Sequence, residues 1–305
     1  MMQARTSRCY GLIVVAVGIL ASAAQSRPAG VAEAAEEKLR IIAFGAHPDD
    51  CDQRVGGTAA LWASRGHLVK FVSVTSGDAG HQSEGGGALA ARRRAEAREA
   101  GRRLGIAEYE TLDNHDGELL PTLAAREQVI RKIRQWKADV VLGPRPHDYH
   151  PDHRYTGVLV QDAAYMVVVP NICPDTKALR KNPVFLYFQD RFERPNPFRP
   201  DVVVAVDSVL EKKVLALDAH VSQMYEWLPW VDGELDHVPE DPKERLAWLR
   251  RTRGGQSLAE PVRAALGKWY GSRAEGVRSA EAFELCEYGR RPSDEELRTL
   301  FPFFD

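Results

Sequence analysis

The sequence has few cysteines, no excess of positive charge and no apolar run long enough to form a membrane-spanning helix. Its 305 residues include four cysteines, and 41 Lys and Arg residues are balanced by 43 Asp and Glu residues. A chain without a basic excess has no charged surface to hold a polyphosphate, which argues against a nucleic-acid partner. No internal repeat is visible, which excludes solenoids and propellers.

The N-terminus has the order of features typical of a secretory signal peptide. Arg5 and Arg8 precede an apolar run that ends at Leu20, and small residues follow. Because this run is shorter than the roughly 20 residues that cross a bilayer, we expect residues 1–24 to be cleaved. The mature protein is then exported, periplasmic or extracellular, with no stable membrane span. Residues 25–38 are expected to be a solvated leader, and no feature indicates an oligomeric state.

The three cysteines that remain after cleavage allow one disulfide at most. These are Cys51, Cys173 and Cys286. An odd count in an oxidising compartment leaves at least one free thiol, and a disulfide scaffold is excluded. The hydrophobic core must therefore hold the fold.

Apolar runs of strand length alternate with helix-like segments over the first two thirds of the mature chain. The strand candidates are residues 39–46, 67–75, 107–112, 139–142, 184–188 and 202–206, and the helix candidates are residues 55–65, 88–104, 123–137 and a segment from about 154. This alternation predicts an α/β fold with a mostly parallel sheet and helices on both faces. Residues 209–225 are expected to form one helix, and residues 226–305 a mostly helical C-terminal extension.

Two clusters of histidine and aspartate follow predicted strands. The sequence AHPDD occupies residues 46–50 and HDYHPDH occupies residues 147–153. In an open α/β sheet, ligands bind at the carboxyl ends of the strands. If the first and fourth strands are neighbours, the two clusters face each other at that edge.

The residue types in these clusters suit a divalent transition metal, which imidazole and carboxylate ligands bind together. His47 and Asp50 are three residues apart around a proline and can aim at one point, and His153 can supply a third ligand from the facing loop. Three protein ligands leave coordination positions open for water, which is the pattern of a catalytic site. A single HPD sequence is most often a loop with an Asp helix cap, but two such clusters at strand ends favour the metal site.

Three further polar residues lie in the same clusters and have no place in this ligand set. Asp49 is a spare carboxylate beside the metal that can take a proton from a bound water. His150 is a spare imidazole on the facing loop, and Asp152 is a candidate to orient it.

The motifs resemble those of a known family of enzymes. They are AHPDD at 46–50, GGT at 56–58, TSGDAG at 75–80 and HPDH at 150–153, with Arg93, Glu96, the loop 113–119 and HVSQ at 220–223. Together they resemble the LmbE-like/PIG-L family of N-acetylglucosaminyl deacetylases over roughly residues 39–225. The resemblance implies a Rossmann-like sheet and a zinc-dependent hydrolase that removes acetyl groups from amino sugars or their conjugates.

The resemblance also implies roles for individual residues, carried over by position. His47, Asp50 and His153 would be the metal ligands, Asp49 the general base, His150 the oxyanion stabiliser, and Arg93 a contact to sugar hydroxyls. The chain departs from many family members directly after AHPDD, where it has Cys51 and Asp52 instead of Glu. We expect Cys51 to be a small packed residue and Asp52 not to be a ligand.

Two other functions stay open. Two histidines and one carboxylate also describe a non-haem Fe(II) enzyme, so Fe(II) is an alternative to zinc. A secreted carbohydrate-binding protein with a non-catalytic metal pocket is the other alternative. A dinucleotide is not expected, because no GxGxxG follows the first strand. Trp227 and Trp230 are expected to pack against the main domain, and stacking on sugar rings is the second interpretation.

Overall fold

The structure is a computed structural model that describes residues 7, 10–12, 38–253, 258 and 260–304. Apart from residues 7 and 10–12, the predicted signal peptide, residues 1–24, lies outside the described residues, and so does the predicted leader, residues 25–38, except for Lys38. The chain from Lys38 onward forms one compact unit. Among the described residues, the helices are too short or too polar to cross a membrane.

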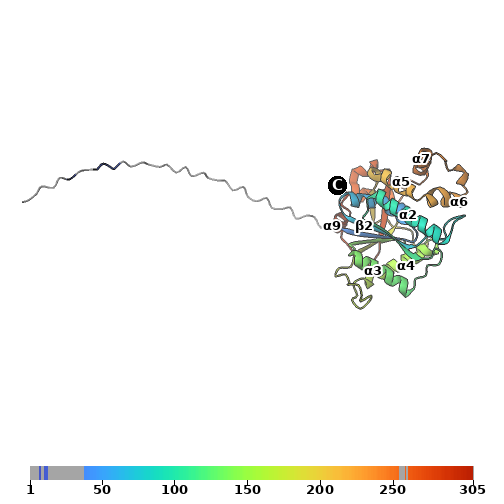
Figure 1. The fold of residues 1–305 in the computed structure, drawn as a ribbon, viewed down its shortest axis with the longest axis horizontal. Coiled ribbons are helices and arrows are strands. Elements are labelled where there is room, and N and C mark those ends of the chain that lie inside the picture. Colours follow the sequence, from blue (N-terminus) through green and yellow to red (C-terminus); the bar gives the residue numbers. More distant parts are fainter. Residues whose placement is uncertain (1–6, 8–9, 13–37, 254–257, 259, 305) are drawn as a thin grey trace, which may run out of the picture. The chain divides into compact units, whose positions relative to one another are not determined.

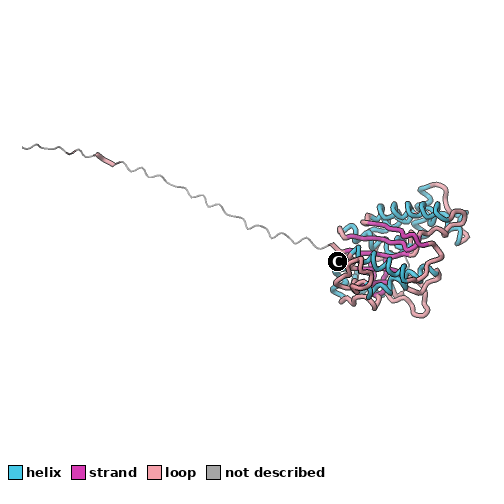
Figure 2. Tube along the Cα trace, turned by 60° about the horizontal axis from the view of Figure 1, so that its bottom comes forward, coloured by secondary structure: helices cyan, strands magenta, loops and turns pink. Residues whose placement is uncertain are grey.

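A seven-stranded sheet forms the centre of this unit, with the strand order β3-β2-β1-β4-β5-β7-β6. The strands are β1 (Arg40–Gly45), β2 (Leu68–Thr75), β3 (Glu108–Asn114), β4 (Val140–Gly143), β5 (Val184–Phe188), β6 (Val202–Ala205) and β7 (Ala280–Leu285). The first five strands pair in parallel, and β7 pairs antiparallel with both β5 and β6. The predicted mostly parallel α/β sheet is confirmed, and Figure 2 shows the strands as a layer between helices.

Helices cover both faces of the sheet, as predicted. They are α1 (Asp50–Ser64), α2 (Gly86–Leu104), α3 (Leu123–Trp136), α4 (Pro151–Met166), α5 (Leu210–Ala219), α6 (Leu228–Val231), α7 (Pro242–Arg253), α8 (Val262–Tyr270) and α9 (Asp294–Leu300). Successive side chains of a strand point to opposite faces, so Ile41 packs in the core with α1 and α2, and Ile42 packs with α3 and α4. In Figure 1, α2 and α5 lie on one face and α3 and α4 on the other.

The first and fourth strands are neighbours, which brings the two His/Asp clusters to the same edge. Ile41 of β1 pairs with Val140 of β4, and Ala43 pairs with Leu142. Because the strands are parallel, both chains leave the sheet at the same end, where His47 follows β1 and the 147–153 loop follows β4. The topology on which the site prediction depended is therefore confirmed.

The C-terminal region is mostly helical, as predicted, but it also contributes β7, which the sequence did not indicate. The sequence of β7, AEAFEL, consists mainly of residues that favour helices, and it forms a strand because β5 and β6 pair with it on either side.

The single helix expected over residues 209–225 is also interrupted. Helix α5 ends at Ala219, and a π-helical segment, Ser222–Trp227, follows. Such segments occur frequently at functional sites.

Glu281 on β7 is a buried charge that joins this strand to α1 and α5. It has no exposed surface. Its carboxylate accepts hydrogen bonds from the backbone N–H of Gly57 at 2.9 Å, the backbone N–H and hydroxyl of Thr58 at 2.7 Å, and the ammonium group of Lys213 at 2.8 Å. Helix α1 begins with Asp50, so this network fixes an element of the predicted metal site to the C-terminal region.

We expect Lys213→Met to lower the free energy of unfolding by about 3–5 kcal/mol, because it leaves the buried Glu281 carboxylate without a cation. The double variant Lys213→Met/Glu281→Gln removes both charges and should regain part of that loss. Urea unfolding of the two variants and the unsubstituted protein measures the difference. Equal stability of the single and double variants would show that the unpaired Glu281 charge is not the cause of the loss.

Candidate metal centre and active site

The three predicted metal ligands come together at the carboxyl end of β1 and β4. His47 follows β1, Asp50 is the first residue of α1, and His153 lies in the first turn of α4. The Nδ1 atom of His47 lies 3.1 Å from Nε2 of His153, and Oδ2 of Asp50 lies 3.7 Å and 3.5 Å from those two nitrogens. Donors at the corners of a tetrahedral zinc site with bonds near 2.0–2.1 Å are about 3.3–3.4 Å apart. The spacing of these three atoms fits such a metal.

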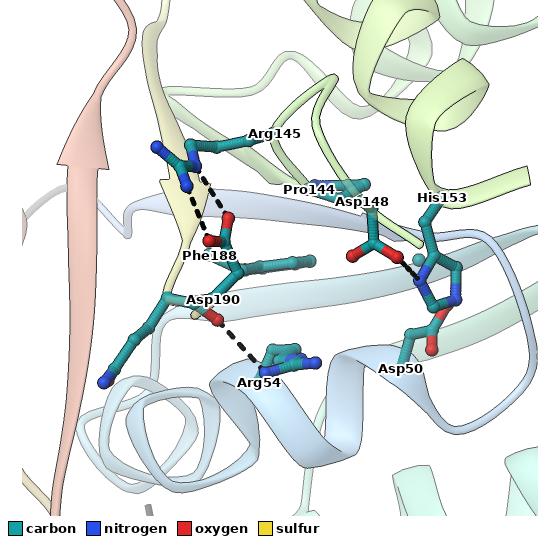
Figure 3. Close-up of a pocket in the computed structure, with 10 residues that line it drawn as sticks. Asp50, Arg54, Pro144, Arg145, Asp148, His153, Phe188 and Asp190 are labelled. Carbon is teal, nitrogen blue, oxygen red and sulfur yellow. Dashed lines mark hydrogen bonds and ion pairs between the residues drawn. The ribbon is translucent and has the colours of Figure 1, made fainter. Parts of the chain in front are cut away.

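The second nitrogen of each histidine faces a carboxylate. Nε2 of His47 lies 3.0 Å from Oδ1 of Asp116 and 3.3 Å from Oδ2 of Asp152, and Nδ1 of His153 lies 2.9 Å from Oδ1 of Asp148. Figure 3 shows the contact between Asp148 and His153, with Asp50 on the other side of the imidazole. Metal-ligating histidines usually pair their other ring nitrogen with a carboxylate, carbonyl or water. The contacts of both histidines therefore agree with a ligand role.

The charges around these residues favour a cation between them. Burial lowers the pKa of His47, but the carboxylates of Asp116 and Asp152 outweigh it and raise that pKa to about 9. Burial also lowers the pKa of His153, and the charge of Asp50 and neighbouring carboxylates raise it to about 10. Burial raises the pKa of the Asp50 carboxyl, but the two imidazoles lower it well below its usual range. A divalent cation can replace the protons that this environment otherwise favours.

Other combinations of donors also lie close enough to hold a metal. The groups His47, His150, His153 and His47, Asp116, Asp152 each have ligand atoms within 4.8 Å of one another. His150 is therefore a candidate ligand as well as a candidate catalytic group. The two roles predict different metal contents when His150 is removed.

Asp49 is buried beside the ligands and lies outside the predicted ligand set. Its φ of 150° lies in the region that non-glycine residues rarely adopt, and such strain is common at functional sites. Its Oδ1 atom accepts a hydrogen bond from Arg93 at 3.0 Å, and its Oδ2 atom accepts one from Gln53 at 2.9 Å. Burial raises the pKa of the Asp49 carboxyl, which the charge of Arg93 opposes and that of Asp50 supports. A raised pKa suits a general base near neutral pH.

His150 lies against the site, and the backbone N–H of Asp152, not its carboxylate, contacts the imidazole. The Nδ1 atom of His150 accepts a hydrogen bond from the backbone N–H of Asp152 at 3.2 Å, and the ring centroid lies 4.7 Å from that of His47. The Asp152 carboxylate instead accepts hydrogen bonds from the backbone of Gly117 at 2.7 Å and Leu119 at 3.3 Å. This arrangement favours a neutral His150 with its proton on Nε2.

Arg93 is buried behind Asp49, and this corrects the expectation that it contacts substrate hydroxyls. Only 2% of its surface is exposed. Its guanidinium donates to the carbonyl of Gly77 at 3.0 Å and to Asp49, and lies 3.7 Å from Asp116. Gly77 has a φ of +69°, and a Cβ on it would lie 2.5 Å from Arg93 Nη1, so only glycine fits over the guanidinium. Arg93 therefore positions carboxylates of the site.

We expect Arg93→Lys to lower kcat by about 10- to 100-fold with little change in KM, because a single ammonium cannot hold both Gly77 and Asp49 in place. The partly exposed neighbour Arg94, changed to Lys, serves as the matched control. Steady-state kinetics separates the two constants. A raised KM with an unchanged kcat would restore Arg93 as a substrate contact.

The residues after AHPDD support the fold around the site. Cys51 is buried in the hydrophobic core, and burial raises the pKa of its thiol well above the usual value, which agrees with a small packed residue. Asp52 is also fully buried and accepts a hydrogen bond from the Tyr109 hydroxyl at 2.9 Å, while His220 lies 3.1 Å away. Among the described residues, Cys51, Cys173 and Cys286 are all free.

A small, partly open pocket adjoins the ligands. Asp50 and His153 form one side, and Phe188 and Arg54 lie further along it (Figure 3). The guanidinium of Arg54 donates to the backbone carbonyl of Gln189 at 3.1 Å. Two of the three predicted ligands, Asp50 and His153, therefore border this small pocket.

Two residues that contact the ligands were not singled out from the sequence. Asp148 lies inside the HDYHPDH cluster, so the sequence shows that it is near the predicted ligands. The sequence does not show that its carboxylate contacts His153. Asp116 lies in the 113–119 loop, which carried part of the family resemblance, and nothing in its surroundings in the sequence marks it as a partner of His47.

Comparisons with known proteins agree with this geometry. The model of the PIG-L family, described as GlcNAc-PI de-N-acetylase, matches residues 42–164. Diacetylchitobiose deacetylase of Thermococcus kodakarensis is 30% identical over 204 residues, which span 63% of this chain and 73% of the relative. A 4-oxalmesaconate hydratase of Pseudomonas putida is 27% identical over 197 residues, which span 61% of this chain and 74% of the relative.

A solved structure is similar over most of its length. The N,N'-diacetylchitobiose deacetylase of Pyrococcus horikoshii, in complex with an inhibitor, aligns with a TM-score of 0.61 and 25% identity. The alignment covers 84% of this chain and 88% of that protein. The extent of these matches, together with the AHPDD and HPDH clusters, shows that the chain belongs to the LmbE-like/PIG-L family.

Proposed function

We propose that the protein is a metal-dependent hydrolase that removes the N-acetyl group from an amino sugar or an amino-sugar conjugate. The observation that carries the proposal is the convergence of His47, Asp50 and His153 beside a buried carboxylate, Asp49, that is free of the ligand set. The relatives that act on diacetylchitobiose support an N-acetylated sugar as the substrate.

We propose zinc as the metal, held by His47, Asp50 and His153. Two nitrogen donors and one oxygen donor suit zinc, and Fe(II) is the alternative that the same donors accept. When bound, the metal supplies Lewis-acid chemistry and lowers the pKa of a water molecule. Metal analysis of the purified protein distinguishes the two ions.

Asp49 acts as the general base and then as the general acid. It accepts the proton of the attacking water as the new carbon–oxygen bond forms at the acetyl carbonyl, and it returns a proton to the leaving nitrogen as the carbon–nitrogen bond breaks. The products are acetate and the free amine. Arg93 and Gln53 hold the carboxylate at the required place throughout.

His150 stabilises the oxyanion. Its Nδ1 accepts the backbone N–H of Asp152, so Nε2 carries the donor proton. An imidazolium at this position would require the hydrogen bond to break, so we propose a neutral donor.

His150→Ala should keep the metal and lower kcat on the order of 10²-fold or more, because one oxyanion donor is lost. Metal content and acetate release should be measured on one preparation. Loss of the metal together with the activity would place His150 among the ligands.

The experiment that tests the proposed function is a screen for acetate release. The protein is loaded with zinc and given N-acetylglucosamine, N,N'-diacetylchitobiose and N-acetylglucosaminyl conjugates. Acetate release supports the proposal, oxygen consumption would identify a non-haem iron enzyme, and sugar binding without acetate would identify a binding protein. Since a hydratase is also among the relatives, absence of acetate release from every substrate would overturn the deacetylase proposal.

A further inference from the structure

A stacked pair of tryptophans adjoins the site and has no role in the proposed hydrolysis. Trp227 ends the π-helical segment and Trp230 lies in α6. Their ring centroids are 5.3 Å apart and their planes differ by 16°. Trp230 keeps 50% of its surface exposed, and Trp227 is partly buried. The two rings therefore stack on each other and leave an indole surface open, although the sequence favoured packing against the main domain.

The tryptophan pair is linked to the metal-binding residues through one tight turn. A Cβ placed on Gly80 would lie 3.2 Å from Oδ2 of Asp116 and 3.8 Å from Nε1 of Trp227. Asp116 is the residue that contacts His47 at 3.0 Å. The N–H edge of Trp227 therefore borders the same turn as a carboxylate of the site. Within the described part of the chain, this indole N–H makes no hydrogen bond, so it is available to a ligand.

The segment that carries the tryptophans is held against the 78–86 loop and helix α2 by polar contacts. The Glu226 carboxylate lies 2.8 Å from Nε2 of His81 and accepts from Arg92 at 2.6 Å. The side chain of Gln223 donates to the carbonyl of Gly80 at 3.0 Å. Because these contacts hold the backbone on both sides of the turn, the tryptophan rings are in place before a ligand arrives, which lowers the cost of binding.

We propose that Trp227 and Trp230 form a subsite for a second pyranose ring, so that the enzyme prefers an oligosaccharide or glycoside to a single amino sugar. The proposal rests on the proposed function and names the substrate class of the same site. An indole offers a flat apolar face and a polar N–H edge. A pyranose ring has a matching apolar C–H face and a rim of hydroxyls. A single N-acetylated sugar at the metal would not need this surface.

Binding measurements on an inactive protein test the subsite directly. Zinc-loaded Asp49→Asn is titrated calorimetrically with N,N'-diacetylchitobiose and with N-acetylglucosamine, with and without Trp230→Ala. We expect Trp230→Ala to weaken disaccharide binding about 2- to 12-fold, the range of a ring-stacking contact, and to leave monosaccharide binding unchanged. Trp230→Phe, which keeps an aromatic face, should retain most of the disaccharide affinity.

The matched control is Tyr165→Ala, which removes another exposed aromatic ring, 65% exposed, from the last turn of α4, the end opposite the site. It should change neither affinity. Equal weakening of both sugars by Trp230→Ala, no weakening of either, or no disaccharide binding before the substitution would overturn the subsite. Failure of the proposed function appears separately, as absence of acetate release by the unsubstituted protein.

Discussion

Asp49→Asn should fold, bind zinc and bind substrate, yet lose about 10²- to 10⁴-fold in turnover, the usual contribution of a general base. Asparagine keeps the shape of the side chain, and its carbonyl oxygen can still accept the hydrogen bond from Arg93. The hydrogen bond between the side chains of residue 49 and Gln53 is also kept if the Gln53 amide rotates, so that its oxygen accepts from the asparagine N–H₂ group. The substituted side chain cannot take a proton from water, so the chemical step alone is affected.

The measurement combines metal content by mass spectrometry with acetate release on the same preparation. Asp175→Asn is the matched control, because Asp175 is an exposed aspartate that pairs with Arg131 outside the site. It should retain full activity. Turnover near that of the unsubstituted protein in Asp49→Asn would contradict the base assignment and transfer the role to another acid, with Asp116 and Asp152, which lie beside Nε2 of His47, as the candidates.

His153→Ala should abolish activity by removing the metal, with bound zinc well below one per chain. A site of three protein ligands that loses one loses most of its chelation. His47→Ala and Asp50→Ala should behave in the same way. The substitution should also make the melting temperature insensitive to a chelator. The unsubstituted protein, in contrast, loses the stabilisation that a bound ligand gives, about 2.7 kcal/mol when free metal is at 100 times Kd.

The matched control is His237→Ala, which removes an exposed histidine that pairs with Glu234 in the C-terminal region. It should keep both the metal and the response to the chelator. One equivalent of zinc retained by His153→Ala would remove His153 from the ligand set and leave His47, Asp116 and Asp152 as the competing group.

The sequence predicted the parts of the fold that depend on local patterns. The first six strands and the helices between them are long or strongly patterned, and they occur where expected. The meeting of His47 and His153 could also be predicted, because it follows from the parallel pairing of β1 with β4. These features need only the period of the apolar residues and the rule that ligands bind at the carboxyl ends of strands.

The features of the fold and the site that the sequence did not predict depend on contacts between distant segments, which a single sequence does not show. Strand β7 has a helix-forming composition and is set by its pairing with β5 and β6. Arg93 looks like one of several exposed arginines on a helix, and only the fold shows that Gly77 covers it and that it holds Asp49. Asp116 contacts His47 across 69 positions of the chain, and no local pattern marks that contact.

The most direct test of a metal-dependent deacetylase is acetate release from N,N'-diacetylchitobiose by one preparation in three states. These are the purified protein, the protein stripped with a chelator, and the stripped protein given one equivalent of zinc. We predict acetate release from the first, its loss from the second and its return in the third, in proportion to the zinc bound. Acetate release that persists after complete removal of the metal would contradict the account.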